Sequence, residues 1–385
     1  MKVLFVSNAS WEPPKGGSTR SNRVWAQQLE MQGHEVKVYA PGAYEPYEPA
    51  RAPQLLRELI SAWKPDWVLV STEDLRQQLL KAALEAAPTR TVYLAHTPQM
   101  FPFGPASLAP NPLGAELVRR CAARIAICQF TADYIARYAG EPAVIVHPPI
   151  YGRPPWERLG AFDAPYVTLI NACAVKGISI FLEVARRLPQ VRFAALVGWG
   201  TTEADRRALA AQPNVTILTP VERIEDLLAQ TRLLLAPSLW PEGFGLVVME
   251  AMLRGVPVVA SDAGGLVEAK QGTSYLIPVR LIERYEVRFD EHRLPAPIIP
   301  PQEIEPWVGA VARLTTDQAE WQRAAAEAYE AGVRFVNSIE PDGLERVLMN
   351  LKPREAREAG APAAASELTA ERRALLLKLA RERRR

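Results

Sequence analysis

The amino-acid sequence predicts an α/β protein with two doubly wound parallel sheets and a cleft between them. Short apolar runs alternate with helical patterns over the first 150 residues, and the same alternation begins again after a proline-rich stretch. This alternation is typical of parallel sheets that helices cover on both faces. The length of 385 residues also suits two domains better than one.

The first forty residues have the pattern of the opening unit of such a sheet. We expect a buried strand at 2–7, a loop at 9–18 that contains Gly16 and Gly17, a helix at 19–32 and a strand at 35–39. A strand, a glycine loop and a helix that leads to another strand form a βαβ unit. Further strands are expected at 67–71, 91–96, 124–128 and 143–147, and helices at 55–63, 74–87, 113–121 and 131–138.

A stretch rich in proline, at 148–165, marks the expected domain boundary. Beyond it, strands are expected at 166–170, 192–197, 215–218, 233–236 and 257–260, with helices at 178–188, 202–211, 224–230 and 246–254. Residues 303–350 have a mostly helical pattern. We therefore expect domains at 1–150 and 151–335, a helix at 336–352 that returns to the first domain, and an Ala/Pro linker with a basic helical tail at 353–385.

Composition excludes several classes of protein. The chain carries 45 Lys and Arg against 43 Asp and Glu, and its body has no basic patch, so a nucleic-acid binder is not expected. Three cysteines without Cys-x-x-Cys spacing argue against a disulfide framework and a structural zinc site. We find neither an export signal nor an apolar run of the roughly 20 residues that span a bilayer, and we expect a cytoplasmic protein.

The segment most informative about chemistry is the loop at 237–245 with the helix that follows it. Gly243 and Gly245 let the backbone approach a ligand closely, and the first N–H groups of the helix can bind a pyrophosphate. Glu242 precedes this turn, and Glu250 lies about one turn into the helix. Two carboxylates so placed can reach the two ends of one extended ligand.

This Glu-x7-Glu pattern across Gly243-Phe244-Gly245 resembles the donor motif of the family 4 retaining glycosyltransferases. The resemblance continues through 255–262 and 264–268, includes Lys176-Gly177 and Gly16-Gly17, and covers about residues 1–350. It implies the GT-B fold, with two Rossmann-like domains: an acceptor-side domain first and a nucleotide-sugar donor domain second. The implied activity is transfer of a sugar from a nucleotide-diphosphate donor to an acceptor hydroxyl.

The resemblance also implies roles for individual residues. Glu242 would bind the donor sugar with the backbone of Phe244, Gly245 and Leu246, while Glu250 would accept hydrogen bonds from the ribose. Lys176 would pair with the diphosphate and stabilise the charge of the leaving group. The donor site expected in this way consists of Gly16, Gly17, Asn171, Lys176, Glu242, Gly243, Phe244, Gly245, Leu246 and Glu250.

Some of these residues have ordinary alternatives. Gly16 and Gly17 fit any loop after a first strand, and a lysine before a glycine is often only surface charge. His96 closes a strand, where a histidine is commonly structural; the family has a histidine near this place beside the donor sugar, so His96 is a candidate catalytic residue. His34, His147 and His292 show no spacing that indicates a metal site.

The sequence departs from the family at Asn171, where an arginine that binds the diphosphate is usual. Asparagine brings no charge, so we expect either weaker donor binding or a substitute such as Arg20 or Arg223. The metal-binding Asp-x-Asp of the other major glycosyltransferase fold is absent from the sequence. We expect no metal and no cofactor, with the nucleotide-sugar as co-substrate.

The acceptor is harder to predict. Met100, Phe101 and Phe103 lie in a proline-rich loop at 98–112; they either pack that loop or line the cleft, and the second case indicates a lipid, polyketide or peptide acceptor. The tail resembles linkers of peptide and polyketide assembly lines, which suggests a docking partner; a solvated helix is the alternative. A sugar-nucleotide epimerase, a phosphorylase and a non-catalytic partner with the same fold remain alternative functions.

Overall fold

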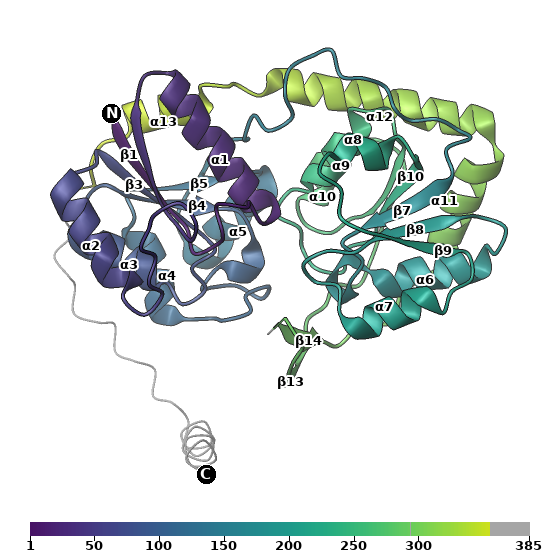
Figure 1. Cartoon of the computed structure of the whole chain (residues 1–385), viewed down its shortest axis with the longest axis horizontal. Helices are drawn as coiled ribbons and strands as arrows, with labels where there is room; N and C mark the ends of the chain where they lie inside the picture. The colour runs from purple at the N-terminus through teal and green to yellow at the C-terminus, as the bar shows by residue number, and fades with distance from the viewer. Residues whose placement is uncertain (293, 355–385) are drawn as a thin grey trace, which may run out of the picture.

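The computed structural model describes residues 1–292 and 294–354 and contains two lobes, each built on a six-stranded parallel sheet (Figure 1). The strand orders are β2-β1-β3-β4-β5-β6 and β12-β11-β10-β7-β8-β9. In each sheet the chain starts at an inner strand and continues outward in both directions. The order therefore reverses between β1 and β3 in the first sheet and between β7 and β10 in the second. The predicted fold class is confirmed.

The first lobe alternates strands and helices throughout. Its strands are β1 (Lys2–Val6), β2 (Glu35–Tyr39), β3 (Trp67–Ser71), β4 (Thr91–Ala95), β5 (Ala123–Ala126) and β6 (Val144–Ile145). Its helices are α1 (Gly16–Met31), α2 (Ala52–Trp63), α3 (Gln78–Ala86), the 3₁₀ helix η1 (Pro98–Met100), α4 (Pro112–Arg120) and α5 (Gln129–Ala139).

The second lobe repeats this plan. Its parallel strands are β7 (Tyr166–Ile170), β8 (Phe193–Leu196), β9 (Val215–Leu218), β10 (Thr231–Ala236), β11 (Val258–Ser261) and β12 (Leu276–Ile277). Its helices are η2 (Ala174–Lys176), α6 (Ile178–Arg187), α7 (Glu203–Ala210), α8 (Ile224–Leu228), α9 (Leu246–Met252), α10 (Leu266–Ala269) and α11 (Glu305–Thr316). An antiparallel hairpin of β13 (Tyr285–Phe289) and β14 (Pro295–Pro297) interrupts the series.

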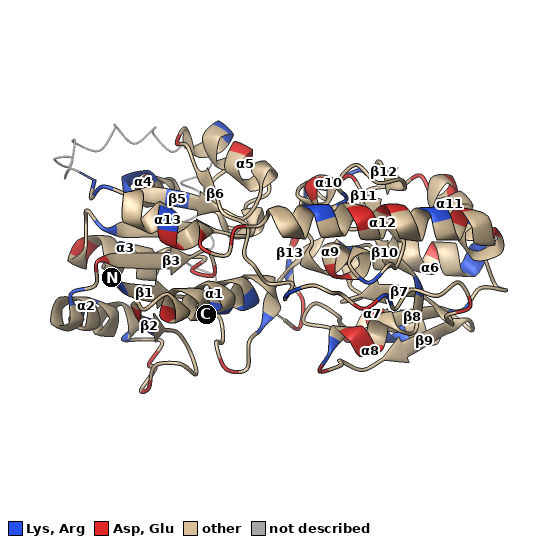
Figure 2. Cartoon of the chain, turned by 90° about the horizontal axis from the view of Figure 1, so that it is seen from above, with Lys and Arg blue, Asp and Glu red and all other residues tan. Residues whose placement is uncertain are grey.

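Burial on both faces explains the continuous apolar runs of the strands. In β1, Val3 and Phe5 belong to one hydrophobic cluster, whereas Leu4 and Val6 belong to another on the opposite face. Alternate side chains of a strand point to opposite faces, so a strand between two layers of helices must be apolar at every position. Figure 2 shows Lys, Arg, Asp and Glu interspersed over the outside of both lobes.

Two C-terminal helices connect the lobes. The long helix α12 (Gln318–Ser338) runs along the second lobe toward the first, where α13 (Gly343–Asn350) packs (Figure 1). Leu344 and Leu348 of α13 are buried, and Glu345 accepts a hydrogen bond from His34 Nε2 at 2.8 Å. The chain thus crosses between the lobes twice, at residues 148–165 and again after α12.

The structure corrects several expected boundaries. The first helix begins at Gly16 instead of residue 19, so Gly16 and Gly17 form its first turn and are not part of a loop. The strand expected at 143–147 is only two residues long, and the sequence reading did not predict β12 or the β13–β14 hairpin. The tail expected at 353–385 lies beyond residue 354 outside the described residues. In the described part of the chain, no helix has the length and hydrophobicity to cross a membrane.

Lys270, directly after α10, is a buried charge that makes stability depend on pH. Its Nζ donates to the Val258 carbonyl at 2.6 Å, and burial lowers its pKa from 10.5 to about 7. Between these values the unfolded chain binds one more proton than the folded chain, so the free energy of unfolding should rise with pH, by at most about 1.4 kcal/mol per pH unit.

Replacing Lys270 with methionine should remove this dependence because methionine does not titrate. Urea unfolding of both proteins between pH 7 and 10 measures the two slopes. The wild-type slope is expected to be the steeper and more positive one. Equal slopes would contradict the lowered pKa of Lys270.

Candidate functional site

Glu242 lies in the loop between β10 and α9, at the carboxyl end of the second sheet. Its Oε1 accepts a hydrogen bond from Lys176 Nζ at 2.5 Å and another from Trp240 Nε1 at 3.0 Å, and the Ser238 hydroxyl also donates to it. The carboxylate is therefore held by three donors from two loops. Hydrogen bonds from an ammonium, an indole and a hydroxyl together fix the orientation of this carboxylate.

Lys176 reaches Glu242 from the neighbouring loop, which follows β7. It ends η2, and the next residue, Gly177, has a left-handed backbone with φ of 79°. A Cβ on Gly177 would lie 1.9 Å from the Pro237 carbonyl oxygen, so only glycine allows the two loops to approach this closely. The Lys176 ammonium also lies 5.3 Å from the centre of the Trp240 ring.

These two loops follow β7 and β10, the strands between which the order of the second sheet reverses. In open parallel α/β sheets, ligands bind at the carboxyl ends of the strands at this reversal. The helix α1, which carries Gly16 and Gly17, follows β1 at the equivalent reversal of the first sheet. The predicted residues from both halves of the sequence thus come together where the topology itself favours a ligand.

Gly264 and Gly265 support the loop that carries Glu242. The Gly265 N–H donates to the Glu242 carbonyl at 2.8 Å, and a Cβ on Gly264 would lie 2.7 Å from the same oxygen. Three residues later, Glu268 accepts hydrogen bonds from His147 Nε2 at 2.8 Å and from the Gln129 N–H at 2.7 Å, both in the first lobe or the segment that leaves it. The Gly-Gly-x-x-Glu segment therefore both shapes the loop and links the lobes.

Glu250 faces the first lobe from α9 and is only 6% exposed. Arg20 of α1 donates to its Oε1 at 2.6 Å, which forms an ion pair across the lobes. The Tyr151 ring lies close by: burial raises the pKa of its hydroxyl, and the charge of Glu250 raises it further. The first turn of α1 approaches as well, because a Cβ on Gly17 would lie 2.9 Å from Leu246 Cδ1.

His96 is buried at the end of β4, with 2% of its surface exposed. Its Nε2 is 2.9 Å from Asn22 Oδ1, and Asn22 in turn donates to Ser71 Oγ at 2.9 Å. Burial lowers the pKa of the imidazole, so the ring is neutral near pH 7. The His96 side chain thus anchors α1, while its carbonyl oxygen lies against Gly243. A catalytic role for this residue stays a prediction.

Asn171 occupies the place of the expected arginine at the end of β7. Its backbone is left-handed, with φ of 58°, a conformation that asparagine tolerates better than most residues. Its Oδ1 accepts the Gly200 N–H at 3.1 Å, and its Nδ2 is buried without a hydrogen-bond partner among the described residues. Arg223, the other suggested substitute, lies exposed just before α8.

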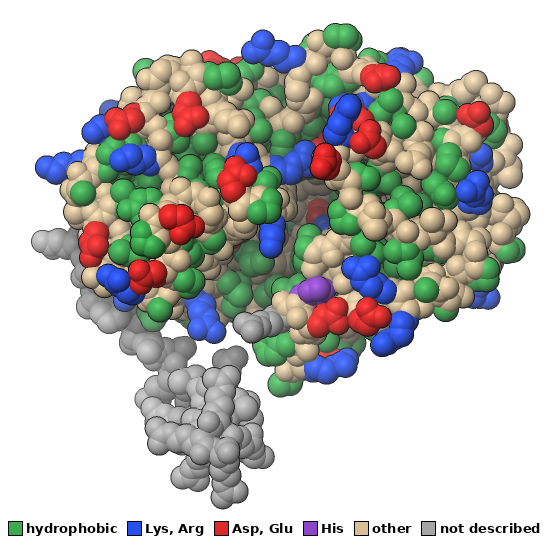
Figure 3. Space-filling view, viewed as in Figure 1, with side chains coloured by type: hydrophobic (Ala, Val, Ile, Leu, Met, Phe, Trp, Pro, Cys, Tyr) green, Lys and Arg blue, Asp and Glu red, His purple; other side chains and the backbone are tan. Residues whose placement is uncertain are grey.

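The lobes touch through the loop that carries Glu242. Gln99 Nε2 donates to the Pro241 carbonyl at 3.0 Å, and the Cys128 thiol donates to the Gly243 carbonyl at 2.7 Å. Figure 3 shows a hollow between the lobes with acidic and basic side chains along it. Phe101 and Phe103 are buried against Tyr134, which favours the loop-packing interpretation for these two rings, while Met100 is half-buried.

Three side chains of the site were not predicted from the sequence. Ser238 and Trp240 bind Glu242 directly, and Trp199 stacks on Trp240 with ring centres 5.9 Å apart while 48% exposed. Trp199 lies between two glycines shortly after β8, and this glycine-flanked position at the end of a strand could have marked it as a candidate site residue. Among the described residues, no group of three His, Cys, Asp or Glu side chains could hold a metal ion.

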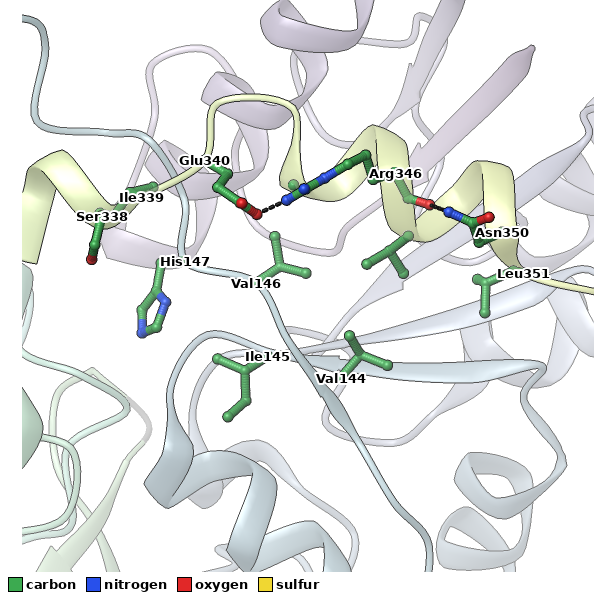
Figure 4. Close-up of a pocket in the computed structure, with 12 residues that line it drawn as sticks. Val144, Ile145, Val146, His147, Ser338, Ile339, Glu340, Arg346, Asn350 and Leu351 are labelled. Carbon is green, nitrogen blue, oxygen red and sulfur yellow. Dashed lines mark hydrogen bonds and ion pairs between the residues drawn. The ribbon is translucent and has the colours of Figure 1, made fainter.

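A separate hollow of about 520 Å³ lies between β6 and α13 (Figure 4). Val144, Val146 and Leu351 contribute apolar side chains, and Arg346 pairs with Glu340 at its rim. None of the predicted donor-site residues lines it. It belongs to the second crossing between the lobes and not to the site of Glu242.

Comparison with protein families gives two matches in series along the chain. The model described as Glycosyltransferase Family 4 matches residues 15–151, and the model described as Glycosyl transferases group 1 matches residues 165–286. The chain therefore contains a family 4 glycosyltransferase domain followed by a group 1 glycosyl transferase domain. One matched segment lies in each lobe.

Among curated relatives, the D-inositol 3-phosphate glycosyltransferase of Rhodococcus erythropolis is 30% identical over 200 residues, which cover 49% of this chain and 38% of the relative. The protein of the same name from Rhodococcus opacus is 31% identical over 140 residues, 36% of this chain and 26% of the relative. The matches thus span well under half of the relatives' length.

Solved structures cover almost the whole chain. HepE of Anabaena, solved in complex with UDP-glucose, has a TM-score of 0.65 at 19% identity and covers 91% of this chain and 98% of its own. Sucrose-phosphate synthase of Thermosynechococcus elongatus has a TM-score of 0.64 at 16% identity, with 91% and 96% covered. At these identities the likeness is one of fold, and the fold is GT-B.

Proposed function

We propose that the protein is a retaining glycosyltransferase that moves a sugar from a nucleoside-diphosphate sugar to an acceptor hydroxyl. The observation that carries the proposal is the meeting of Glu242 and Lys176 at the reversal of the second sheet. A carboxylate that can accept sugar hydroxyls and a cation that can bind phosphate are there side by side. The solved complex of HepE with UDP-glucose makes a UDP-sugar the first donor to test.

In the proposed reaction the acceptor oxygen attacks the anomeric carbon on the face from which the diphosphate departs. The carbon–oxygen bond to the phosphate breaks, and its electron pair leaves with the diphosphate. The acceptor proton passes to a departing phosphate oxygen. Lys176 stabilises the developing charge. Glu242 and Glu250 orient the sugar and the ribose, and contact between the lobes excludes water from the reacting carbon.

Metal independence is part of the proposal. Lys176 supplies positive charge where the diphosphate would lie, and the sequence lacks the Asp-x-Asp that bridges metal and diphosphate in the other major fold. The nucleotide-sugar would be the co-substrate, without a further cofactor. Phe101 and Phe103 are packed inside the first lobe, so they give no support to an apolar acceptor.

A thermal-shift panel of UDP-, GDP-, dTDP- and ADP-sugars tests the proposal. A ligand that binds only the folded protein raises stability by about 2.7 kcal/mol at a hundredfold excess over its dissociation constant. One donor is expected to raise the melting temperature of the wild type, and Glu250→Ala should lose most of that shift because the ribose loses its acceptor. Product analysis with the active donor then separates sugar transfer from epimerisation and phosphorolysis.

A negative panel would have a definite meaning. If no donor shifts the melting temperature of the wild type, the protein does not bind nucleotide sugars, and a non-catalytic role becomes the better account. Asn171 is the residue that favours that alternative, since it removes a cation from the diphosphate site. Binding without any product would lead to the same conclusion about catalysis.

A further inference from the structure

We propose that Arg20 exchanges partners when the donor binds: it leaves Glu250 and becomes the second cation on the diphosphate. The proposal rests on the proposed function and adds a residue from the first lobe to the donor site. It starts from a comparison of charges: the cations of the site are paired with carboxylates, whereas a nucleotide sugar would bring negative charge only on its diphosphate. The ion pair between Arg20 and Glu250 is the pair that the donor would have to separate.

The site holds two cations and two carboxylates, and each cation is paired. Lys176 binds Glu242 at 2.5 Å, and Arg20 binds Glu250 at 2.6 Å. A nucleoside-diphosphate sugar brings two negative charges on the diphosphate but only neutral hydroxyls on the sugar and the ribose. The hydroxyls can take over both carboxylates by donating hydrogen bonds, and the diphosphate can then take over both cations. Such an exchange leaves no buried charge without a partner, which would be costly.

Arg20 and a ribose would compete for the same oxygen of Glu250. Its side chain is 7% exposed, and among the described residues Arg20 is its one side-chain hydrogen-bond partner. A ribose hydroxyl that donates to Oε1 must therefore approach where the guanidinium lies. The Tyr151 hydroxyl is buried beside Glu250 and has no hydrogen-bond partner among the described residues. A ribose hydroxyl that bound here could therefore also form a hydrogen bond with Tyr151.

Arg20 is built to move while its helix stays in place. The neighbouring Asn22 fixes α1 through hydrogen bonds to His96 and Ser71. The Arg20 side chain, in contrast, is 44% exposed, so it can change partners without disturbing the core. Its planar guanidinium suits phosphate oxygens, to which arginine can donate two parallel hydrogen bonds.

Because Asn171 is uncharged, a second cation on the diphosphate would have to come from another part of the chain. The Oδ1 of Asn171 is occupied by the Gly200 N–H. Because Arg20 belongs to the first lobe and Glu250 to the second, the exchange also ties donor binding to the contact between the lobes. The same guanidinium that pairs with Glu250 across the lobes would hold both lobes onto the diphosphate of the bound donor.

The test compares a diphosphate with the nucleoside that lacks it. Calorimetric titration of the full chain with UDP, GDP, dTDP and ADP, and with uridine, guanosine, thymidine and adenosine, identifies the pair that binds the wild type. Arg20→Gln should then weaken binding of that diphosphate at least about tenfold, about 1.4 kcal/mol. Binding of the nucleoside should be unchanged or tighter, because Arg20 no longer competes for Glu250.

The matched control is Arg23→Gln on the same helix. Arg23 pairs with Glu12 at 2.9 Å and donates to the Trp11 carbonyl, away from Glu250. The Arg23→Gln substitution removes the same charge from α1 and should leave the affinities for the diphosphate and the nucleoside unchanged. Arg20→Lys should retain part of the affinity for the diphosphate. The melting temperature of each unliganded variant establishes that it is folded.

The two proposals fail in different ways. If the wild type binds none of the four diphosphates, the proposed function fails. If it binds one and Arg20→Gln binds it equally well, the exchange is refuted. Equal weakening of the diphosphate and the nucleoside would also overturn the exchange, since Arg20 would then act on Glu250 or on the lobes alone.

Discussion

Replacing Lys176 with alanine is expected to lower the turnover number for sugar transfer on the order of 10²–10³-fold. That range corresponds to the loss of one preorganised donor that stabilises transition-state charge in an enzyme. Lys176 is suited to this role because its Nζ lies beside Glu242 and the Trp240 ring, at the carboxyl end of the second sheet. The charge of the leaving diphosphate increases as the bond to the sugar breaks, so the loss should appear mainly in kcat, with a smaller change in KM.

Initial-rate measurements with the donor identified by the panel check this expectation. Lys176→Arg keeps the charge and should retain more activity than the alanine variant. Lys81→Ala serves as the control, because Lys81 lies on the outer surface of α3 with a loose pair to Glu85 at 3.9 Å. Its rate should match that of the wild type. A Lys176→Ala enzyme within threefold of the wild-type kcat would remove the lysine from the catalytic step.

The sequence was sufficient to predict the two sheets because strand and helix patterns are local. The strand 166–170 and the strand 215–218 have the expected bounds, and the apolar runs of β1, β3 and β4 reflect burial on both faces. Boundaries shifted where a turn could be either loop or helix, as at Gly16. The β13–β14 hairpin was missed although apolar and polar residues alternate strictly over Tyr285–Phe289, because its partner strand, Pro295–Pro297, contains two prolines, which are uncommon in strands.

The site was only partly predictable because its contacts join distant parts of the chain. Glu242 and Lys176 could be named from their motifs, and the structure brings them within hydrogen-bond distance across 66 positions. The pair of Arg20 and Glu250 spans 230 positions and depends on how the lobes meet. Trp240 was overlooked because an indole near a carboxylate gives no periodic signal, although its N–H donates to Glu242.

The substitution Gly177→Ala is expected to destabilise the fold by about 3 kcal/mol or more and to abolish most of the activity. Two effects add at this position. The left-handed backbone, with φ of 79°, costs roughly 1–2 kcal/mol for alanine. The new Cβ would also lie 1.9 Å from the Pro237 carbonyl oxygen, so the loops after β7 and β10 must move apart. The movement would separate Lys176 from Glu242, and a displacement of about 1 Å can reduce catalysis on the order of 100-fold.

Gly140→Ala isolates the backbone effect from the clash. Gly140 ends α5 with φ of 71°, and a Cβ there would meet no atom within 4 Å. It should therefore cost only the 1–2 kcal/mol or so of the left-handed conformation and leave transfer unaffected. Urea unfolding of both variants gives the two free energies. If Gly177→Ala were no more destabilising than Gly140→Ala, the loops after β7 and β10 would be able to separate at little cost. The close approach of these loops would then not be what positions Lys176.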